Sequence, residues 1–350
     1  MEEDYLQEYK GEPYEMYEHH RITADKGQGL VRLDKFLMDR LEHATRNKLQ
    51  EAMKAGHVLV NGNTVKPSYK VKPGDEIKVF LEKPKRNIEI FPEDLPLDIR
   101  YEDPDVVVVH KEAGMVVHPA YGNYSGTLLN AMKHYLQNNE PEAKPLMVHR
   151  IDKNTTGLML MAKHEQAQSC LAKQFYDHNT KRNYIALVWG DIKDNEGTIT
   201  GNLGRSKKDR KVMTVYPKGD HGKHAVTHYK VLERFGYVTA VECELETGRT
   251  HQIRAHMKYI GHPLFNDQTY GGDRIRKGTS FSKYKQFIDN AFKLCPRQAL
   301  HAKTLGFKQP TTGAWIQLES NIPQDMKQVM DKWRTYAQAS INSKQNPQTL

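Results

Sequence analysis

The sequence predicts an α+β protein in which a small α/β module precedes a larger domain, built on a mixed, mostly antiparallel sheet flanked by helices. Its 350 residues are enough for two domains of about 100–200 residues each. Residues 30–90 combine short helical patterns with strand–turn–strand patterns. From residue 95 to about 335, strand and helix signals follow one another too irregularly for a helical bundle, which favours the α+β class.

Composition narrows the functional classes. Lys and Arg number 52 against 43 Asp and Glu, and this net charge of +9 favours a polyanionic partner. The cysteines Cys170, Cys243 and Cys295 are far apart and include no CxxC pair. Neither a zinc ribbon nor a disulfide framework is therefore expected, and a reducing cytoplasm fits best. No apolar run approaches the ~20 residues that cross a bilayer, so we predict a soluble protein without a membrane partner.

Both ends of the chain are predicted to be flexible tails. The first 30 residues hold eight acids against three bases and show little apolar periodicity, so residues 1–29 are interpreted as an acidic tail. Residues 336–350 are rich in Asn, Gln and Ser and are expected to fray. Pro84 to Pro96 reads as a linker between the two domains.

The module at residues 30–90 is predicted to hold two helices and a small hairpin sheet. Thr45 can cap the second helix, and Gly56 ends it. The strings "HVLVNGNTV" and "KPGDEIKVFL" each indicate a strand, a turn and a strand. The apolar faces of the two helices are formed by Leu33, Phe36, Leu37 and Leu41, and by Leu49, Ala52 and Met53.

Basic side chains decorate these two helices, and for a generic segment they would form only a solvated polar face. The strings "RLDKFL", "AGHVLVNG" and "KPGDEI" nevertheless resemble the S4-type RNA-binding domain over the whole module. This resemblance implies that the helices present their basic face to RNA phosphates. The residues concerned are Arg32, Lys35, Arg46 and Lys48, with Lys54 beside them.

The densest group of reactive residues is "VHRIDKNTTGLMLMAKH", Val148 to His164. Asp152 stands on a predicted loop, directly before an apolar strand. Arg150 beside it favours the ionised carboxylate, which can act as nucleophile or base. The alternative is that Asp152 only closes a turn, where Asp is common.

A second group lies in "LETGRTHQIRAHMKYIGHP", where Arg249, His251, Arg254 and His256 fall within eight positions. They can simply decorate the polar face of a helix. A metal site is not expected, because the two histidines are five residues apart and no acid or Cys completes a ligand set. An arginine here can pair with Asp152 or with phosphate, since its planar fork binds oxyanions.

A third group is the predicted strand "KRNYIALVWG", Lys181 to Gly190, which displays Tyr184. A tyrosine in a strand is commonly a packing residue. Its functional alternatives are stacking on a nucleic-acid base or handling a proton beside one.

These strings, in the order "HRIDKNTTGL", "KRNYIALVWG", "GRTHQIRAHM" and "RQALHA", resemble the RluA family of pseudouridine synthases over roughly residues 95–330. The resemblance implies the pseudouridine synthase fold and the isomerisation of uridine in RNA, which needs neither cofactor nor metal. It implies that Asp152 is the catalytic carboxylate and Tyr184 the active-site tyrosine. It also implies that Arg254 is the positively charged residue that pairs with the aspartate. Arg150 matches an arginine thought to contact RNA or help flip the target base.

Further RNA contacts are predicted at Arg249, His251 and the basic loop "GRSKKDRKVM". The loop is expected to span a hairpin, and it either clamps phosphate or is merely solvated. Its basic residues are Arg205, Lys207, Lys208, Arg210 and Lys211.

The strings "VVHPAYGNYSGTLLNAMKHYL" and "KHAVTHYKVLE" are similar to family members that modify helix 69 of large-subunit ribosomal RNA. This likeness implies action on that RNA or on a pre-ribosomal particle, and separately we expect a monomer. The alternatives are a synthase for another ribosomal or transfer RNA site, or a non-catalytic RNA-binding or ribosome-assembly protein. A hydrolase with Asp152 as base would need a second carboxylate or a metal, for which the sequence offers no convincing partner.

Overall fold

The structure is a computed structural model that describes residues 16–25, 29–38, 40–41, 46–81, 90–119, 123–206, 208–209, 211–219 and 221–345. The chain divides into two compact units, Met1–Glu89 and Ile90–Leu350. Each unit has its own hydrophobic core and is described by itself.

The N-terminal unit contains both predicted helices. The turn at Asn61 and Gly62 has φ values of 50° and 83°, which is the left-handed conformation that tight hairpins favour. Leu33, Phe36 and Leu49 are buried in its core, as the helical spacing predicts. Its elements are β1 (Tyr17–Thr23), β2 (Val31–Arg32), α1 (Leu33–Met38), α2 (Arg46–Lys54), β3 (Val58–Val60), β4 (Asn63–Thr64), β5 (Lys70–Val71) and β6 (Glu76–Leu81). Thr45 lies outside the described residues.

Strand pairing in this unit differs from the prediction of two simple hairpins. The strands form a four-stranded sheet in the order β1-β6-β3-β4, while β5 pairs with β2. At the turn between β5 and β6, the Asp75 carboxylate accepts hydrogen bonds from Lys72 N and Asn61 Nδ2, both at 2.8 Å. This carboxylate fastens the turn to the β3–β4 hairpin, so β6 lies beside β3 rather than β5.

The prediction of a flexible tail through residue 29 is wrong for Tyr17–Thr23. These residues form β1, which pairs antiparallel with β6, and Ile22 packs against the core. The edge of β6 presents unpaired backbone groups, and β1 satisfies them with its own. Residues 1–15 and 26–28 lie outside the described residues.

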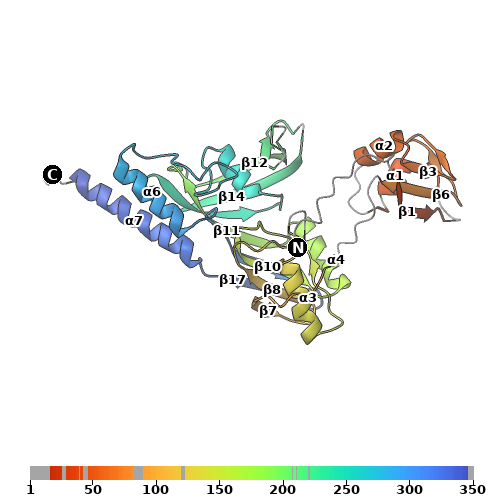
Figure 1. The fold of residues 1–350 in the computed structure, drawn as a ribbon, viewed down its shortest axis with the longest axis horizontal. Coiled ribbons are helices and arrows are strands. Elements are labelled where there is room, and N and C mark those ends of the chain that lie inside the picture. Colours follow the sequence, from red (N-terminus) through yellow and green to blue (C-terminus); the bar gives the residue numbers. More distant parts are fainter. Residues whose placement is uncertain are drawn as a thin grey trace, which may run out of the picture. The chain divides into compact units, whose positions relative to one another are not determined.

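The second unit is built on one large sheet (Figure 1). Among the described residues the sheet has eleven strands, in the order β13-β12-β14-β15-β11-β16-β10-β8-β7, with β17 beside β16 and β9 beside β10. Every described pair is antiparallel except β10 with β16. The mixed, mostly antiparallel sheet of the prediction is therefore confirmed.

The elements of this unit follow the predicted alternation of strands and helices. The strands are β7 (Asp98–Glu102), β8 (Val106–Lys111), β9 (Leu146–Met147), β10 (Thr156–Ala162), β11 (Lys181–Trp189), β12 (Glu196–Arg205), β13 (Met213–Tyr216), β14 (Lys223–Arg234), β15 (Val238–Leu245), β16 (Leu300–Lys308) and β17 (Trp315–Glu319). The helices are α3 (Leu128–Asn139), α4 (Glu165–Tyr176), α5 (Gln252–Tyr259), α6 (Ser282–Leu294) and α7 (Gln324–Gln345).

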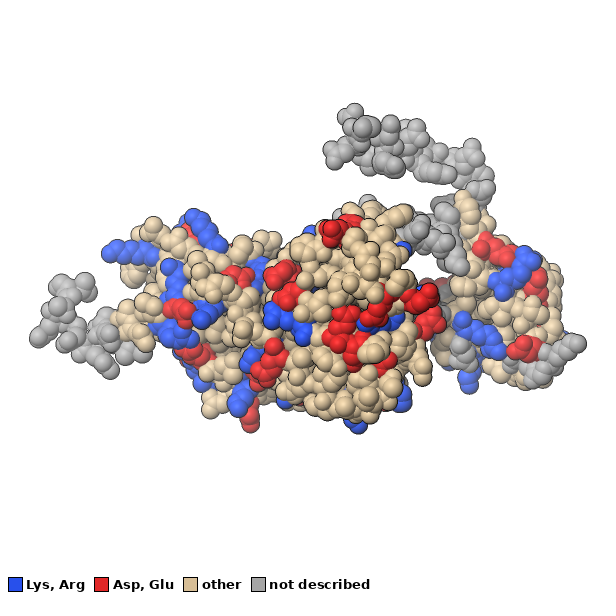
Figure 2. Space-filling model, turned by 90° about the horizontal axis from the view of Figure 1, so that it is seen from below, with Lys and Arg blue, Asp and Glu red and all other residues tan. Residues whose placement is uncertain are grey.

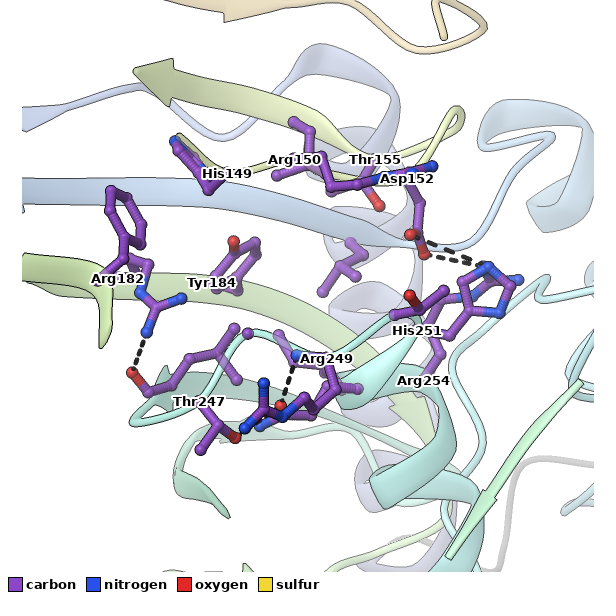
Figure 3. Close-up of a pocket in the computed structure, with 18 of the residues that line it drawn as sticks. His149, Arg150, Asp152, Thr155, Arg182, Tyr184, Thr247, Arg249, His251 and Arg254 are labelled. Carbon is purple, nitrogen blue, oxygen red and sulfur yellow. Dashed lines mark hydrogen bonds and ion pairs between the residues drawn. The ribbon is translucent and has the colours of Figure 1, made fainter. Parts of the chain in front are cut away.

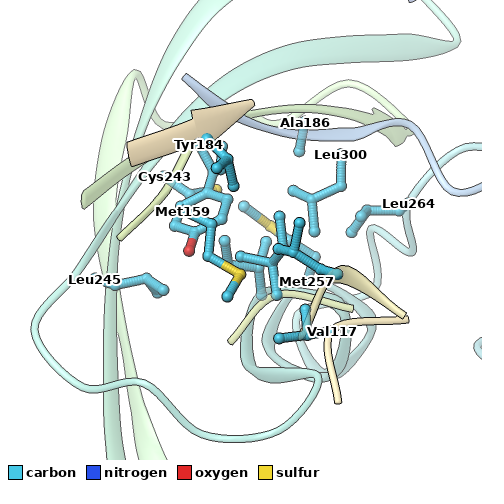
Figure 4. Close-up of a cluster of buried hydrophobic side chains, with 14 of the residues drawn as sticks. Val117, Met159, Tyr184, Ala186, Cys243, Leu245, Met257, Leu264 and Leu300 are labelled. Carbon is cyan, nitrogen blue, oxygen red and sulfur yellow. The ribbon is translucent and has the colours of Figure 1, made fainter. Parts of the chain in front are cut away.

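Alternation along β11 builds a core on each face of the sheet. Ile185 and Leu187 belong to the cluster that α6 and α7 cover, and Figure 1 shows these two helices side by side. Tyr184 and Ala186 point to the other face, where residues of α3 and α5 complete a second cluster (Figure 4). Tyr184 is therefore positioned by a fully buried central strand on the face that carries α5.

The prediction of a frayed tail from residue 336 is wrong, because α7 continues to Gln345. The cause is aromatic packing. The ring of Tyr336 lies 4.7 Å from that of Phe287 in α6 and 5.7 Å from that of Trp333, measured between centroids. These contacts hold the helix past the point where its polar composition suggests that it ends.

Charge is unevenly spread over the second unit. Figure 2 shows acidic side chains gathered on one face, over the part of the unit that carries α3 and β7. Asp98 and Glu102 come from β7, and Glu140 caps α3. Such a face repels a polyanion, so RNA is expected to bind elsewhere on this unit. No helix in the described ranges is long and apolar enough to span a membrane.

Candidate active site

Asp152 lies on the loop between β9 and β10, and two buried cations fix the backbone that follows it. Lys111 Nζ donates to Lys153 O at 3.0 Å, and Arg297 Nη1 donates to Asn154 O at 3.1 Å. Asp152 O itself accepts a hydrogen bond from Thr155 N at 3.0 Å. Hydrogen bonds thus fix the loop at the consecutive carbonyl groups of residues 152–154. The carboxylate of Asp152 therefore has little freedom to move.

Lys111 uses all three of its ammonium hydrogens to join this loop to the turn that follows β8. Besides Lys153 O, its Nζ donates to Glu112 O at 2.6 Å and to Met115 O at 2.9 Å. Burial and, after it, the nearby charge of Arg297 lower the pKa of Lys111 to about 7, against the opposing charge of Asp152. Only the protonated amine can donate to three acceptors at once, so the arrangement requires the ammonium form.

The carboxylate of Asp152 is aimed by a chain of ion pairs (Figure 3). Arg254 Nη1 donates to Asp152 Oδ2 at 2.9 Å. The other edge of the same guanidinium binds Asp267 through two bonds, Nε to Oδ2 at 2.7 Å and Nη2 to Oδ1 at 2.9 Å. Asp267 is fully buried, Arg254 is 6% exposed and Asp152 is 21% exposed. The buried guanidinium of Arg254 therefore joins a buried carboxylate, that of Asp267, to the solvent-accessible carboxylate of Asp152.

Arg254 is held firmly in its charged form. Burial by itself lowers the pKa of this guanidinium, but the hydrogen bonds and negative charges of Asp267 and Asp152 outweigh burial and raise the pKa above its ordinary value. The contact with Asp152 is the pairing that the sequence predicted for an arginine of this helix. Arg254 reaches Asp152 because α5 begins at Gln252, directly beside the loop.

A cavity of about 770 Å³ opens beside Asp152. Tyr184 forms part of its wall, and in Figure 3 this side chain lies between Asp152 on one side and Arg182 on the other. Burial raises the pKa of Tyr184, so its hydroxyl stays protonated at neutral pH. Arg150 also lines the cavity, as an exposed side chain.

Asp152 separates this cavity from a second one of about 370 Å³, which Arg150, Arg254 and His251 line as well. Three residues that line the two cavities have left-handed backbone: His178 at φ 59°, His251 at 54° and Asn266 at 56°. Such strain costs on the order of 1–3 kcal/mol per residue and tends to collect at functional sites.

The two histidines of the second sequence group have different surroundings. His251 Nδ1 shares a hydrogen bond with Tyr270 Oη at 3.1 Å, and its Nε2 is 4.0 Å from Asp152 Oδ1. Burial lowers the pKa of His251, which disfavours a cationic contact to phosphate. His256 is buried against Thr227, away from the cavities. No group of potential metal ligands occurs among the residues described.

Comparison with known proteins identifies the chain. The family model described as RNA pseudouridylate synthase matches residues 105–259, and the S4 domain model matches residues 31–77. An uncharacterized RNA pseudouridine synthase of Chlorobaculum parvum is 46% identical over 91% of this chain and 99% of its own length. The chain belongs to the RluA family of RNA pseudouridine synthases.

One further relative supports this assignment, and one solved structure shows the fold. Ribosomal large subunit pseudouridine synthase D of Salmonella typhimurium is 40% identical over 89% of this chain and 93% of its own length. The structure of human RNA pseudouridylate synthase domain containing 4 covers 68% of this chain and 93% of its own, with a TM-score of 0.53 at 20% identity. The latter match shows the fold alone. The chain is thus an isomerase with an S4 RNA-binding domain and the pseudouridine synthase fold.

The predicted RNA-binding residues of the synthase's S4 unit are organised around an acid that the sequence analysis missed. Asp34 is fully buried, and its carboxylate accepts hydrogen bonds from Arg32 and Arg46, with Nη2 and Nε at 2.9 and 3.0 Å, and from Gln50 at 2.8 Å. Both arginines stay about half exposed. Lys35 is exposed, while the side chain of Lys48 lies outside the described part of the chain.

Two other predicted contacts sit near the synthase's cavities. Arg249 is half-buried on the cavity wall, and its Nε donates to His224 O at 3.0 Å. The basic loop spans the β12–β13 hairpin as predicted, with Arg205 opposite Met213. Lys208 is exposed there, whereas Lys207 and Arg210 lie outside the described residues.

Proposed function

We propose that this synthase converts uridines of large-subunit (23S) ribosomal RNA to pseudouridine, with helix 69 as the target region and Asp152 as the catalytic carboxylate. The observation that carries the proposal is the Asp152–Arg254 contact at 2.9 Å beside a cavity that Tyr184 lines. The ribosomal target rests on the likeness to relatives named ribosomal large subunit pseudouridine synthase D, at 36–41% identity. Ribosomal RNA also suggests the cytoplasm as the place of action.

The reaction breaks the N1–C1′ bond of uridine, turns the uracil and forms a C5–C1′ bond. The electron pair of the broken bond stays with the uracil, and the C5 proton leaves in the last step while N1 gains one. No atom is lost or gained overall. The chemistry therefore requires a group that acts at the sugar, a surface that holds the detached base and a means of exposing it.

Asp152 is suited to act at the sugar. Its carboxylate either attacks C1′ or removes a proton from C2′ to give a glycal, and both routes use the same exposed oxygen atoms. Arg254 occupies one of those atoms, so it orients the carboxylate without covering it. Tyr184 offers a ring on which uracil can stack, and its hydroxyl can relay the C5 proton by passing its own hydrogen to a water molecule.

The target uridine must leave its stack before Asp152 can reach C1′. Extrusion of a base costs a few kcal/mol, and least in loops and single strands. Arg150 lines both cavities, where it can fill the vacated space or grip the backbone phosphate. In the S4 unit, Arg32, Lys35, Arg46 and Lys48 supply phosphate contacts, and in the catalytic unit Arg249, Lys207 and Lys208 supply them. His251 contacts the RNA as a neutral imidazole, through a hydrogen bond.

Asp152→Asn tests the assigned role. The substitution keeps the side chain's size and a hydrogen-bond acceptor for Arg254 but removes the charge. We expect unchanged RNA affinity and a fall in single-turnover rate of ~10⁴-fold or more, the scale seen when an essential group of an active site is removed. Tritium release from C5-labelled uridine RNA measures this rate. Turnover within tenfold of wild type would remove Asp152 from the chemistry.

The target is tested by a pseudouridine map of ribosomal RNA from cells with and without the protein. Loss of modification in helix 69 is the expected result, with restoration by wild type and not by Asp152→Asn. Loss at another ribosomal or transfer RNA position would replace the helix 69 assignment and keep the enzyme. Restoration by Asp152→Asn would favour a role in ribosome assembly without catalysis.

A further inference from the structure

Arg182 is a buried cation whose charge no described carboxylate balances. It lies on β11 two residues before Tyr184, is 5% exposed and lines the same cavity. Its Nη2 donates to the main-chain oxygens of Leu245 and Glu246 at 3.2 and 3.0 Å. Its Nε has no hydrogen-bond partner among the described residues. A guanidinium buried in this way is costly unless a ligand supplies an acceptor or a negative charge.

The surroundings of Arg182 increase the need for an anion. Burial lowers the pKa of Arg182, and the nearby charge of Arg249 lowers it too. The guanidinium carbon lies 5.2 Å from the ring centroid of Phe175, whose other contact is a stacked His149 at 4.8 Å. Burial lowers the pKa of His149 to about 3, so this neighbour is a neutral ring and does not offset the charge of Arg182.

Space is kept open around the remaining nitrogen of Arg182. A Cβ atom added to Gly248 would lie 2.8 Å from Nη1, so a larger residue at this position would force the guanidinium to shift. Nη1 makes no hydrogen bond to a described residue, since both hydrogen bonds of this side chain start at Nη2. A donor with this freedom at the cavity wall is available to a ligand.

Position along β11 indicates which part of the ligand Nη1 meets. Side chains two residues apart on a strand share a face at ~6.6 Å spacing. Tyr184 stands between Asp152 and Arg182 in Figure 3. If the sugar of the target nucleotide is at Asp152 and its base stacks on Tyr184, the far edge of the base, with its carbonyl oxygens, points toward Arg182.

We propose that Arg182 is a further catalytic residue, which binds a carbonyl oxygen of the flipped uracil and stabilises the negative charge of the base once the N1–C1′ bond is broken. The inference rests on the proposed role of Asp152. When that bond breaks, the electron pair left on N1 spreads over the ring to the two carbonyl oxygens. Arg182 transfers no proton; it holds this anion until C5 has bonded to C1′. A fixed charge aimed at developing charge is the most effective kind of catalytic group.

The test compares Arg182→Gln and Arg182→Lys with wild type on a C5-tritiated helix 69 transcript and, in parallel, full-length 23S transcript. We expect Arg182→Gln to lower the single-turnover rate at saturating RNA by ~10²–10³-fold, the range for loss of one oxyanion donor. Arg182→Lys keeps the charge and should recover part of the loss. RNA affinity and its salt dependence should stay at wild-type values for both variants.

A second substrate separates this role from a structural one. In RNA that carries 5-fluorouridine, the electron-withdrawing fluorine itself stabilises the detached base. The fold-loss caused by Arg182→Gln should therefore be smaller than with uridine, measured as the rearranged nucleoside by chromatography and mass spectrometry. A variant that is merely misfolded loses the same factor on both substrates, and thermal unfolding of each variant checks its fold independently.

Other outcomes overturn the proposal. A wild-type rate for Arg182→Gln would exclude a catalytic role. Weaker binding with a salt slope reduced by about one, at an unchanged saturated rate, would show that Arg182 binds backbone phosphate instead. Neither result touches Asp152, whose role fails only if Asp152→Asn retains activity, so the two proposals fall separately.

Discussion

The two units of the synthase contain acid–arginine clusters that are built in opposite ways. In the catalytic unit a buried guanidinium, Arg254, joins two carboxylates and leaves one of them, Asp152, at the surface of a cavity. In the S4 unit a buried carboxylate, Asp34, joins two guanidinium groups and leaves both half exposed. In each cluster the buried side chain fixes the geometry. The more exposed side chains carry the charge that acts on the RNA.

This difference matches the ligands. A catalytic carboxylate must be single, oriented and reachable, so one cation holds it from behind. A surface that binds the RNA backbone gains from several cations spread along it, because each phosphate contact adds to affinity and releases a counterion. Asp34 reduces the net charge of its surface by one, but it fixes two donors in place. The same ion-pair chemistry thus serves reaction in one unit and recognition in the other.

The largest effect is expected from breaking the catalytic cluster at its centre. Arg254→Met leaves Asp267 as a buried carboxylate without its cation, and removal of one partner of such a pair costs about 3–5 kcal/mol. Asp152 also loses its orienting contact, so activity should fall together with stability. Thermal or denaturant unfolding and the tritium assay measure the two losses.

A double variant separates the two losses. Arg254→Met with Asp267→Leu removes both buried charges, so we expect most of the stability to return while activity stays low. Equal loss of stability in the single and double variants would show that packing, and not the unpaired charge of Asp267, sets the cost. Recovery of activity in the double variant would contradict the orienting role of Arg254.

Acid pH should weaken the S4 unit through Asp34. The hydrogen bond from Arg32, together with those from Gln50 and Arg46, holds the pKa of Asp34 well below its ordinary value. A carboxylate with a depressed folded-state pKa stabilises the fold above its unfolded pKa of about 3.9, and this contribution is lost as pH falls through the folded value. The protection of the α1 and α2 amides against hydrogen exchange, taken relative to unfolded exchange rates at each pH, should therefore fall below about pH 4 in the full chain.

The control for the acid effect is Asp34→Asn, which has no carboxylate to protonate. This variant should be less stable than wild type near neutral pH, and the difference should shrink as the pH falls. A difference that stays constant down to pH 2 would mean that Asp34 does not titrate as its surroundings indicate.

The exposed arginines of the S4 unit should set affinity and not rate. Arg46→Gln removes one phosphate-binding charge, so RNA affinity should fall a few-fold and the slope of log K against log salt should decrease by about 0.7–0.9. The single-turnover rate at saturating RNA should stay at the wild-type value. Filter binding at several salt concentrations measures the slope.

The matched control is Arg21→Gln on β1, where Arg21 pairs with the exposed Glu18 and takes no part in the Asp34 cluster. It removes the same charge and should reduce the slope less. Equal slopes for the two variants would show that net charge alone governs binding, and that the Asp34 cluster has no special role.

Much of the catalytic site could be predicted from the sequence, because its members lie in short strings with strong local patterns. The loop position of Asp152 follows from the apolar strand after it. The residues alone left an arginine of the second group to pair with Asp152 or with phosphate, and the resemblance to the RluA family pointed to Arg254. Asp267 could not be found in this way. An acid in a polar, glycine-ended loop resembles any turn residue, and only the folded chain brings this one beside Arg254.

The fold shows the same limit. The two helices of the S4 unit and the Asn61–Gly62 turn depend on local sequence and were predicted correctly. Strand β1 was missed because its stability comes from β6, more than 50 residues later, and α7 was cut short because its last turns depend on rings in α6. Asp34 was missed for a similar reason, since Arg46 and Gln50 approach it from the next helix.

The smallest effect is expected at the β12–β13 hairpin, where Lys208→Gln with Lys211→Gln tests whether the loop clamps phosphate. Hydrogen bonds from Lys208 N to Ser206 Oγ and from Lys211 N to Asp209 Oδ1 shape the loop and leave both ammonium groups to solvent. Tyr270 Oη accepts from Met213 N at 3.0 Å and also meets His251, so the base of the hairpin is tied to the active site.

If the hairpin lysines clamp phosphate, the double substitution should reduce the slope of log K against log salt by up to two. The single-turnover rate at saturating RNA should change little. Substitution of Lys283 and Lys285, which are exposed on α6 away from the cavities, provides a control with the same loss of charge. If both pairs leave the salt dependence of wild type unchanged, the hairpin lysines are solvated, and recognition by exposed cations belongs to the S4 unit and the cavity rim. If only the hairpin pair reduces the slope, the catalytic unit holds a recognition surface of its own, and reaction and recognition are not divided between the two units.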